Sequence, residues 1–382
     1  MKIVVAGDYC PTERISEMLT KNDFSFFDEI KEIVKGADYS IVNLECPIVA
    51  DGVKPIKKCG PCLRANGKVV ESIRYAGFDC VTLANNHFRD YGDDGCLTTI
   101  EELKQQNIDY VGGGCNLAEA QKILCKDIDG KRLAIVNFCE NEFSIATENR
   151  AGSAPMDMID NYHQIVEARA NADYVLLIVH GGHEYYQLPS PRMKKLYRHF
   201  VDLGVDAVVN HHQHCYSGYE YYKGRPIVYG IGNLCFDNVG FRGDIWNEGY
   251  LVEIDLGTSE SSGIKLTPYS QCDVDAQVSI ACSENYRVFF DKIEKINCTI
   301  QDDIMLKFEF EKWVDRRSSV VMSVFASYHN RYLNGAARRG YIPRPINMRE
   351  IASTINFIGC ESHRDVTMSV LENEFNKDEK NS

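Results

Sequence analysis

The sequence lacks any apolar run long enough to cross a membrane. Its longest run, Tyr174 to Val179, has the length of a strand, whereas a transmembrane helix needs about 18 apolar residues or more. The apolar stretch after Lys2 ends at Gly7-Asp8 and is too short for the core of a secretory signal peptide. We therefore expect no integral membrane segment and a cytoplasmic protein.

Basic residues are also too few for a nucleic-acid-binding protein. The chain has 42 Lys and Arg against 55 Asp and Glu, which gives a formal net charge of -13 at pH 7. A surface this acidic repels phosphate backbones, so nucleic acid is excluded as a partner of the whole chain. The Arg316-Arg317 and Arg338-Arg339 pairs are isolated and are typical of solvated faces.

A second C-x2-C pair is missing. Cys59-Gly60-Pro61-Cys62 is the one such motif in the sequence, and zinc sites of this kind usually need two. The spacing alone therefore disfavours a metal or redox role. The chain has 15 cysteines, scattered and often inside apolar strand patterns such as those around Cys139 and Cys235. This distribution indicates reduced, buried thiols.

The first two thirds of the sequence alternate short β-rich runs with helical patterns, which predicts a layered α/β domain with largely parallel strands. The expected strands are Lys2–Ala6, Tyr39–Leu44, Cys80–Leu83, Asp109–Val111, Leu133–Phe138, Tyr174–Val179, Ala207–Val209, Ile227–Tyr229 and Tyr250–Ile254. The expected helices between them are Phe24–Lys35, Val69–Tyr75, Gly95–Gln106, Tyr162–Ala170 and Arg192–Leu203. We place the end of this domain at residue 272.

Residues 273–382 form a mostly helical C-terminal region in this interpretation. The expected helices there are Val288–Ile296, Asp302–Tyr328 and Arg364–Asn373, and the segment Arg338–Pro345 is expected to be a loop because it holds two prolines.

Polar residues that can bind metals follow the predicted strands at the points where the strands end. They are Asp8, Glu45, Asn86, His180, His212 and His214. In open α/β sheets, ligands bind beyond the carboxyl ends of the strands, so these side chains converge if the strands are neighbours. Three histidines within four residues, His211 to His214, are the strongest single signal.

This mixture of side chains suits two divalent ions about 3.5–4 Å apart, with Glu45 as the bridging carboxylate. Imidazole and carboxylate together favour Mn, Fe or Zn over Mg. Such an ion pair clamps a phosphate-like oxyanion and generates a hydroxide near neutral pH. His87, next to Asn86, is placed to protonate the leaving group.

The order of these motifs resembles the CapA family of poly-γ-glutamate capsule biosynthesis proteins, which is similar to calcineurin-like metallophosphoesterases. The motifs are Gly7-Asp8, Asn43-Leu44-Glu45, Asn85-Asn86-His87, His180-Gly181-Gly182-His183-Glu184-Tyr185, His211-His212-Gln213-His214 and Gly230-Ile231-Gly232-Asn233, over about residues 1–256. The resemblance implies a four-layer αββα metallophosphoesterase-like sandwich. It also implies that Asp8, Glu45 and His214 hold one metal and that Glu45, Asn86, His180 and His212 hold the other. His87 is then the acid or transition-state stabiliser.

The sequence departs from the metallophosphoesterase pattern at two ligand positions. Cys10 stands where those enzymes usually have a histidine, and it is either a thiolate ligand or a bystander. Glu45 stands where they use a bridging aspartate.

Four further residues are candidates for substrate binding. Arg64 belongs to a lysine-rich segment, Ala50–Asn66, that could grip an acidic substrate; a solvated loop is the alternative. Glu184, His211 and Asn233 follow strand ends and either face the pocket or serve packing and turns.

The favoured function is a metal-dependent hydrolase of the phosphoesterase type in capsule or cell-surface polymer biosynthesis. It would act on an anionic small molecule or polymer. Two alternatives remain open: a metal-dependent amide hydrolase acting on a poly-γ-glutamate-like polymer, and a non-catalytic accessory subunit of a polymer synthase. The sequence does not fix the oligomeric state.

Overall fold

The computed structural model describes residues 1–257, 263–325, 328, 330–359, 367–368 and 371. The chain divides into two compact units, Met1–Phe308 and Glu309–Ser382. The predicted helix Arg364–Asn373 lies largely outside the described residues.

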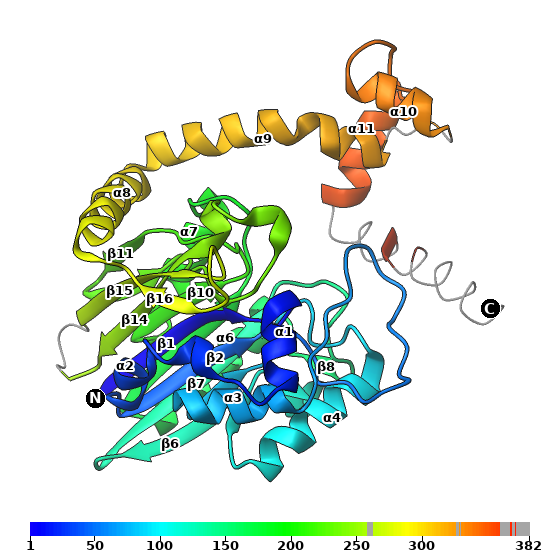
Figure 1. Cartoon of the computed structure of the whole chain (residues 1–382). Coiled ribbons are helices and arrows are strands. Elements are labelled where there is room, and N and C mark those ends of the chain that lie inside the picture. The colour runs from blue at the N-terminus through cyan, green and yellow to red at the C-terminus, as the bar shows by residue number, and fades with distance from the viewer. Residues whose placement is uncertain (258–262, 326–327, 329, 360–366, 369–370, 372–382) are drawn as a thin grey trace. The chain divides into compact units, whose positions relative to one another are not determined.

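The first unit contains a sheet of eight strands with a parallel centre (Figure 1). Its strands run in the order β16 (Val278–Ile280), β15 (Gly263–Gln271), β14 (Glu248–Asp255), β1 (Lys2–Tyr9), β2 (Tyr39–Leu44), β3 (Cys80–Thr82) and β4 (Asp109–Val111), and β13 (Asn233–Cys235) pairs with the end of β1. Strands β1 to β4 pair in parallel, and β14 to β16 are antiparallel.

A second sheet of six strands faces the first. Its order is β11 (Tyr219–Tyr222), β12 (Arg225–Val228), β10 (Ala207–His211), β9 (Tyr174–His180), β7 (Lys131–Cys139) and β6 (Leu124–Ile128). The central strands again pair in parallel, and the edges are antiparallel. A small sheet joins β5 (Gly113–Gly114) to β8 (Gly152–Ser153).

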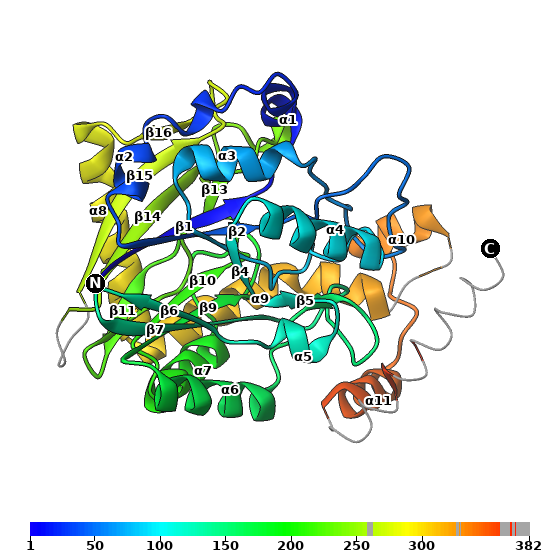
Figure 2. The ribbon, with the colours of Figure 1, turned by 90° about the horizontal axis from the view of Figure 1, so that it is seen from below.

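Helices cover the outer faces of the two large sheets (Figure 2). The helices of the first unit are α1 (Glu13–Thr20), α2 (Lys31–Lys35), α3 (Lys68–Ala76), α4 (Gly92–Gln105), α5 (Leu117–Ala120), α6 (Met158–Asn171), α7 (Pro191–Asp202) and α8 (Ser283–Gln301), with short 3-10 turns at Ser25–Phe27 (η1), Val239–Phe241 (η2) and Ile245–Asn247 (η3). The predicted helix Phe24–Lys35 is therefore broken into η1 and α2.

Three apolar cores separate the layers. One lies between the first sheet and helices α1 to α4, one lies between the two sheets, and one lies between the second sheet and helices α6 and α7. Strands such as β1 and β9 are buried on both faces, which explains their continuous Val, Ile and Leu runs. The four-layer αββα fold class is confirmed.

The first unit extends beyond residue 272, where we placed the domain boundary. Helix α8 packs Phe289 and Ile293 into the core between the sheets. Lys194 of α7 is buried and donates to the carbonyl of Ile300 at the end of α8. These contacts make α8 part of the compact unit that carries the sheets.

The described part of the second unit is helical. It contains the rest of α9 (Asp303–Phe325), which begins in the first unit, and α10 (Arg331–Arg338) and α11 (Met348–Gly359). Helix α10 ends at Arg338, and the rest of the segment Arg338–Pro345 is a loop, as expected. Among the helices that the structure describes, none combines the length and the apolar character needed to span a bilayer.

An ion pair fastens α1 to the loop that follows β13. Arg14 donates to both carboxylate oxygens of Asp237, from Nε at 2.7 Å and from Nη2 at 2.9 Å, and it also donates to the carbonyl of Cys272. The Asp237 side chain is fully buried. Burial acts to raise the pKa of Asp237, but the Arg14 guanidinium outweighs it and the net pKa lies below the usual range.

Asp237→Asn is therefore expected to lower the free energy of unfolding by about 3 kcal/mol near pH 7, because it leaves a cation beside a neutral buried group. The contribution of an ionised Asp237 is present above the ordinary carboxyl pKa of about 4 and fades as pH falls through the lower folded-state value. Urea unfolding of both proteins at several pH values measures this. A stability difference that does not shrink in acid would contradict the prediction.

Candidate metal centre

The first sheet presents three of the predicted residues at the carboxyl ends of neighbouring strands. Asp8 lies near the end of β1, Glu45 directly follows β2, and Asn86 lies four residues after β3. At Gly7 the chain passes so close to β13 that a Cβ atom would lie 2.0 Å from the carbonyl oxygen of Gly232. Glycine at this position lets β13 pair with the end of β1 beside Asp8.

The second sheet presents the histidines. His180 is the last residue of β9, and His212 and His214 follow β10, the parallel neighbour of β9. Both His212 (φ 93°) and His214 (φ 53°) have left-handed backbone conformations, which non-glycine residues rarely adopt. Backbone strain of this kind clusters at functional sites, where the surrounding structure holds it in place.

One candidate ligand group is formed by Glu45, His180 and His212. The Nε2 atom of His180 lies 3.5 Å from Oε1 of Glu45 and 3.2 Å from Nδ1 of His212. It also lies 3.0 Å from Oδ1 of Asn86, which brings the amide to the same point. Ligand atoms that share one ion at about 2.1 Å lie about 3–3.5 Å apart, so these spacings fit a single divalent cation.

A second candidate group is formed by Asp8, Glu45 and His214. The Nε2 atom of His214 lies 3.6 Å from Oε1 of Glu45. Its Nδ1 atom lies 2.9 Å from Oδ1 of Asn233, so an N–H donated there leaves Nε2 free to face Glu45. Glu45 is common to both groups, which is the position of a bridging carboxylate.

The surroundings of the Glu45 carboxylate indicate whether a cation fits the site. Its side chain is fully buried, and both carboxylate oxygens lack a hydrogen-bond partner among the described residues. Burial and the neighbouring Asp8 carboxylate raise the pKa of Glu45 well above its usual range. A buried, unpartnered carboxylate between imidazoles is costly unless a cation compensates it, so the residues present fit a metal ion.

The surroundings of His180 and His212 favour the neutral imidazole that metals require. Burial, and then the neighbouring His212, hold the pKa of His180 well below its usual range. Burial and His214 lower the pKa of His212 to about 4. Asp8 is the ionised member of the site: burial acts to raise its pKa, but the hydrogen bond with His211 is the main effect that lowers it, and the net pKa lies below the usual range.

His87 lies beside these groups in a network of its own. Its Nδ1 atom is 2.6 Å from Oδ2 of Asp90, which fixes the ring and leaves Nε2 available. Lys58 donates to the other oxygen of Asp90, and its Nζ lies 3.2 Å from Nδ1 of His87. Burial lowers the pKa of His87, although Asp90 acts in the opposite direction.

The structure places three other predicted residues behind the site. His211 has its Nδ1 3.0 Å from Oδ1 of Asp8, and Asn233 accepts from His214, so both are placed to position ligands. Cys10 is fully buried and falls in neither ligand group. Burial and the neighbouring Cys46 raise the pKa of the Cys10 thiol well above its usual range, which favours a neutral bystander.

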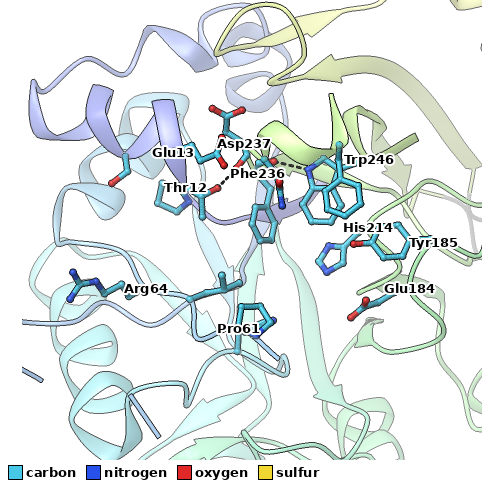
Figure 3. Close-up of a pocket in the computed structure, with 16 residues that line it drawn as sticks. Thr12, Glu13, Pro61, Arg64, Glu184, Tyr185, His214, Phe236, Asp237 and Trp246 are labelled. Carbon is cyan, nitrogen blue, oxygen red and sulfur yellow. Dashed lines mark hydrogen bonds between the residues drawn. The ribbon is translucent and has the colours of Figure 1, made fainter. Parts of the chain in front are cut away.

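A pocket of about 570 Å³ opens beside His87 and His214 (Figure 3). Arg64 and Glu184, two of the residues that we expect to bind substrate, are among its lining residues. Aromatic side chains form one wall: Phe241 stacks on Trp246 and on Tyr185, with ring centroids 4.9 and 5.4 Å apart. The pocket thus joins His214, a member of one candidate ligand group, to a partly apolar surface.

Two residues that position the site were missed at the sequence level. Asp90 fixes the ring of His87 through its Nδ1 atom. The i, i+3 spacing of the two residues was the sequence signal that could have identified Asp90. Asn43 donates to Oδ1 of Asp8 at 2.7 Å and lies 3.4 Å from Nδ1 of His180. Its place in the Asn43-Leu44-Glu45 motif was the available signal.

Comparison with known proteins identifies the family. The model of the bacterial capsule synthesis protein PGA_cap matches residues 2–238, which is more than half of the chain. The chain belongs to the PGA_cap family. The CapA resemblance stated from the sequence is confirmed.

Curated relatives of this PGA_cap protein include two from Bacillus. The capsule biosynthesis protein CapA of Bacillus anthracis is 32% identical over 62% of this chain and 60% of its own length. The PGA biosynthesis protein CapA of Bacillus subtilis (strain 168) is 31% identical over 69% of each chain. A sizeable part of each relative thus lies outside the match.

Among solved structures, a phosphatase from Mycoplasma pneumoniae matches the PGA_cap protein with a TM-score of 0.46 and 14% identity, over 72% of this chain and 95% of the other. With a TM-score below 0.5, this likeness does not bear on the chemistry of the site.

Proposed function

We propose that this protein is a metal-dependent hydrolase that cleaves phosphoester bonds in capsule or cell-surface polymer biosynthesis. The observation that carries the proposal is the buried, unpartnered Glu45 carboxylate, which is shared by two candidate ligand groups, one with His180 and His212 and one with Asp8 and His214. Asp8, Glu45 and His214 would hold one divalent transition-metal ion, Mn, Fe or Zn. Glu45, Asn86, His180 and His212 would hold a second.

Bound ions of this kind polarise a phosphate and lower the pKa of a nearby water. The protein would supply the proton for the leaving group from His87. Asp90 holds Nδ1 of His87, so Nε2 is the atom that faces the pocket side. An anionic phosphate beside His87 would raise its pKa and load Nε2 with that proton.

The substrate would be an anionic small molecule or polymer. Arg64 lines the pocket and brings a cation to its edge. The family membership connects the protein to capsule synthesis, and a role in that process is part of the proposal.

Metal analysis of full-length protein purified without chelator tests the first step. We expect one to two transition-metal ions per chain, with removal by chelator lowering both the melting temperature and the turnover of phosphomonoesters and diesters. Glu253→Gln is the matched control, because Glu253 is a buried carboxylate on β14 that pairs with Lys265 away from the metal groups. This variant should keep its metal.

The same assay separates the alternatives. Shortening of γ-glutamyl polymers without phosphoester turnover would replace the phosphoesterase proposal with amide hydrolysis. Metal-loaded protein that turns over neither substrate class would favour a non-catalytic accessory subunit. Protein without any bound metal would defeat the hydrolase proposal itself.

A further inference from the structure

The segment between Pro47 and Ala65 is a loop whose two ends are joined by backbone hydrogen bonds. The amide of Val49 donates to the carbonyl of Ala65 at 3.0 Å, and the amide of Ala65 donates to the carbonyl of Pro47 at 2.9 Å. We call residues 49–64 the capping loop. Its far side reaches the pocket, where Pro61 and Arg64 are lining residues (Figure 3).

One residue, Asp90, holds the capping loop at three points. Its carbonyl accepts from the amide of Ile56 at 2.9 Å. Its carboxylate accepts from the Lys58 ammonium through Oδ1 and from the amide of Leu63 at 2.7 Å through Oδ2. The Lys58 side chain is only 4% exposed, so this contact is shielded from water. The same carboxylate holds His87.

The Cys-Gly-Pro-Cys motif lies between two of these anchor points. Cys59 directly follows Lys58, and Cys62 directly precedes Leu63. The chain bends at Cys59 and Gly60, and Gly60 has φ +82°, a left-handed conformation that glycine adopts without strain. Asp90 binds Lys58 and Leu63, the residues that flank the motif. Cys59 and Cys62 therefore lie on one short bend whose ends are held at the same carboxylate.

The two thiols differ in their surroundings. Cys59 is exposed, whereas Cys62 is half-buried and its Sγ points at the carbonyl of Ile56 at 3.7 Å. A disulfide requires an S–S separation of about 2.05 Å. Closing it would turn Cys62 away from Ile56 and shift the flanking residues Lys58 and Leu63, which are the ones bound to the Asp90 carboxylate.

We propose that Cys59 and Cys62 form a reversible disulfide, and that its formation loosens the Lys58 and Leu63 contacts with Asp90 that position His87. The oxidant is a low-molecular-weight organic disulfide. The Cys59 thiolate attacks it and releases one thiol, and Cys62 then attacks the mixed disulfide and releases the second. The protein loses two hydrogen atoms, and one disulfide is reduced to two thiols.

The test uses full-length protein equilibrated in glutathione redox buffers. Peptide mass mapping should find a Cys59–Cys62 disulfide, and hydrogen exchange at the Leu63 amide should be at least ~10-fold faster in oxidised than in reduced protein. Phosphoester turnover, an arm that rests on the proposed function, should fall about 10-fold, since loss of groups that orient site residues typically costs about 10–100-fold. Reduction should break the disulfide and return both the exchange rate and the turnover to their starting values.

Matched variants separate the switch from general damage. Cys59→Ser should abolish the response to oxidant, and Cys115→Ser, which removes another exposed thiol, should preserve it. Lys58→Met should reproduce the turnover loss of the oxidised state in reduced protein, whereas Lys21→Met, which removes an exposed lysine outside the capping loop, should not.

The outcomes are distinguishable from failure of the proposed function. If neither redox state turns over a phosphoester but the disulfide forms and the Leu63 amide exchanges faster, the proposed function fails and the switch stands. If only mixed disulfides form, or the disulfide forms with unchanged exchange at Leu63, the switch is wrong.

Discussion

Glu45→Gln is expected to remove bound metal and to lower phosphoester turnover more than ~100-fold. Loss of groups that merely orient ligands already costs about 10–100-fold in many metal sites, and Glu45 is shared by both candidate groups. Glutamine keeps the shape of the side chain but supplies no negative charge between the imidazoles. Metal analysis and steady-state kinetics on the same preparations measure both effects.

The stability of this variant provides a second readout. In metal-free wild-type protein, burial and Asp8 raise the pKa of Glu45, so the neutral acid is favoured there. Glutamine resembles that neutral acid, and metal-free Glu45→Gln should therefore unfold at a temperature close to that of metal-free wild type. Chelator should lower the melting temperature of the wild type and leave that of the variant unchanged. A variant that still binds two ions would refute the bridging role.

His87→Ala is expected to lower phosphoester turnover by about 10²–10⁴-fold while metal content stays at the wild-type level. That range is typical of the loss of a general acid or base. His87 belongs to neither metal group but lines the pocket, with Asp90 fixing its Nδ1 atom. The expected defect is therefore in kcat.

The choice of substrate sharpens the His87 experiment. Phosphoesters with a good leaving group such as nitrophenolate need little proton donation, so the variant should recover much of its rate on them. His163→Ala, at an exposed histidine of α6, is the matched control and should behave as wild type. Loss of metal together with activity in His87→Ala would instead indicate a structural role for this residue.

The strands that carry the site could be predicted because they are buried on both faces. β1 and β9 contain unbroken runs of Val, Ile and Leu whose length is typical of buried strands, and β2 is buried at every position. Once these strands were placed, the polar residue at each carboxyl end followed from the sequence. The grouping of Asp8 and Glu45 with the histidines was implied only by the family resemblance, because the strand pattern does not show that the two sheets face each other. The structure brings these residues together from the two sheets.

Elements without such a pattern were missed. β6 is an edge strand whose residues are mostly half-exposed and include Lys126 and Asp127, and it was not among the predicted strands. Helix α10 is short and has little buried surface, with Ala337 as its buried residue. Asp90 was missed because its role depends on the capping loop folding back over it, a contact between segments 32 residues apart at Lys58.

The two-sheet origin of the site has a consequence for assembly. Asp8 and Glu45 belong to one half of the sandwich, and His180, His212 and His214 belong to the other. Neither half alone presents a complete ligand set, so an ion held there would bind fully only after the two sheets have packed together. Once bound, it would cross-link them. Metal binding would then follow the packing of the two sheets during folding. Loss of the ion at the start of unfolding would indicate that the two sheets separate first.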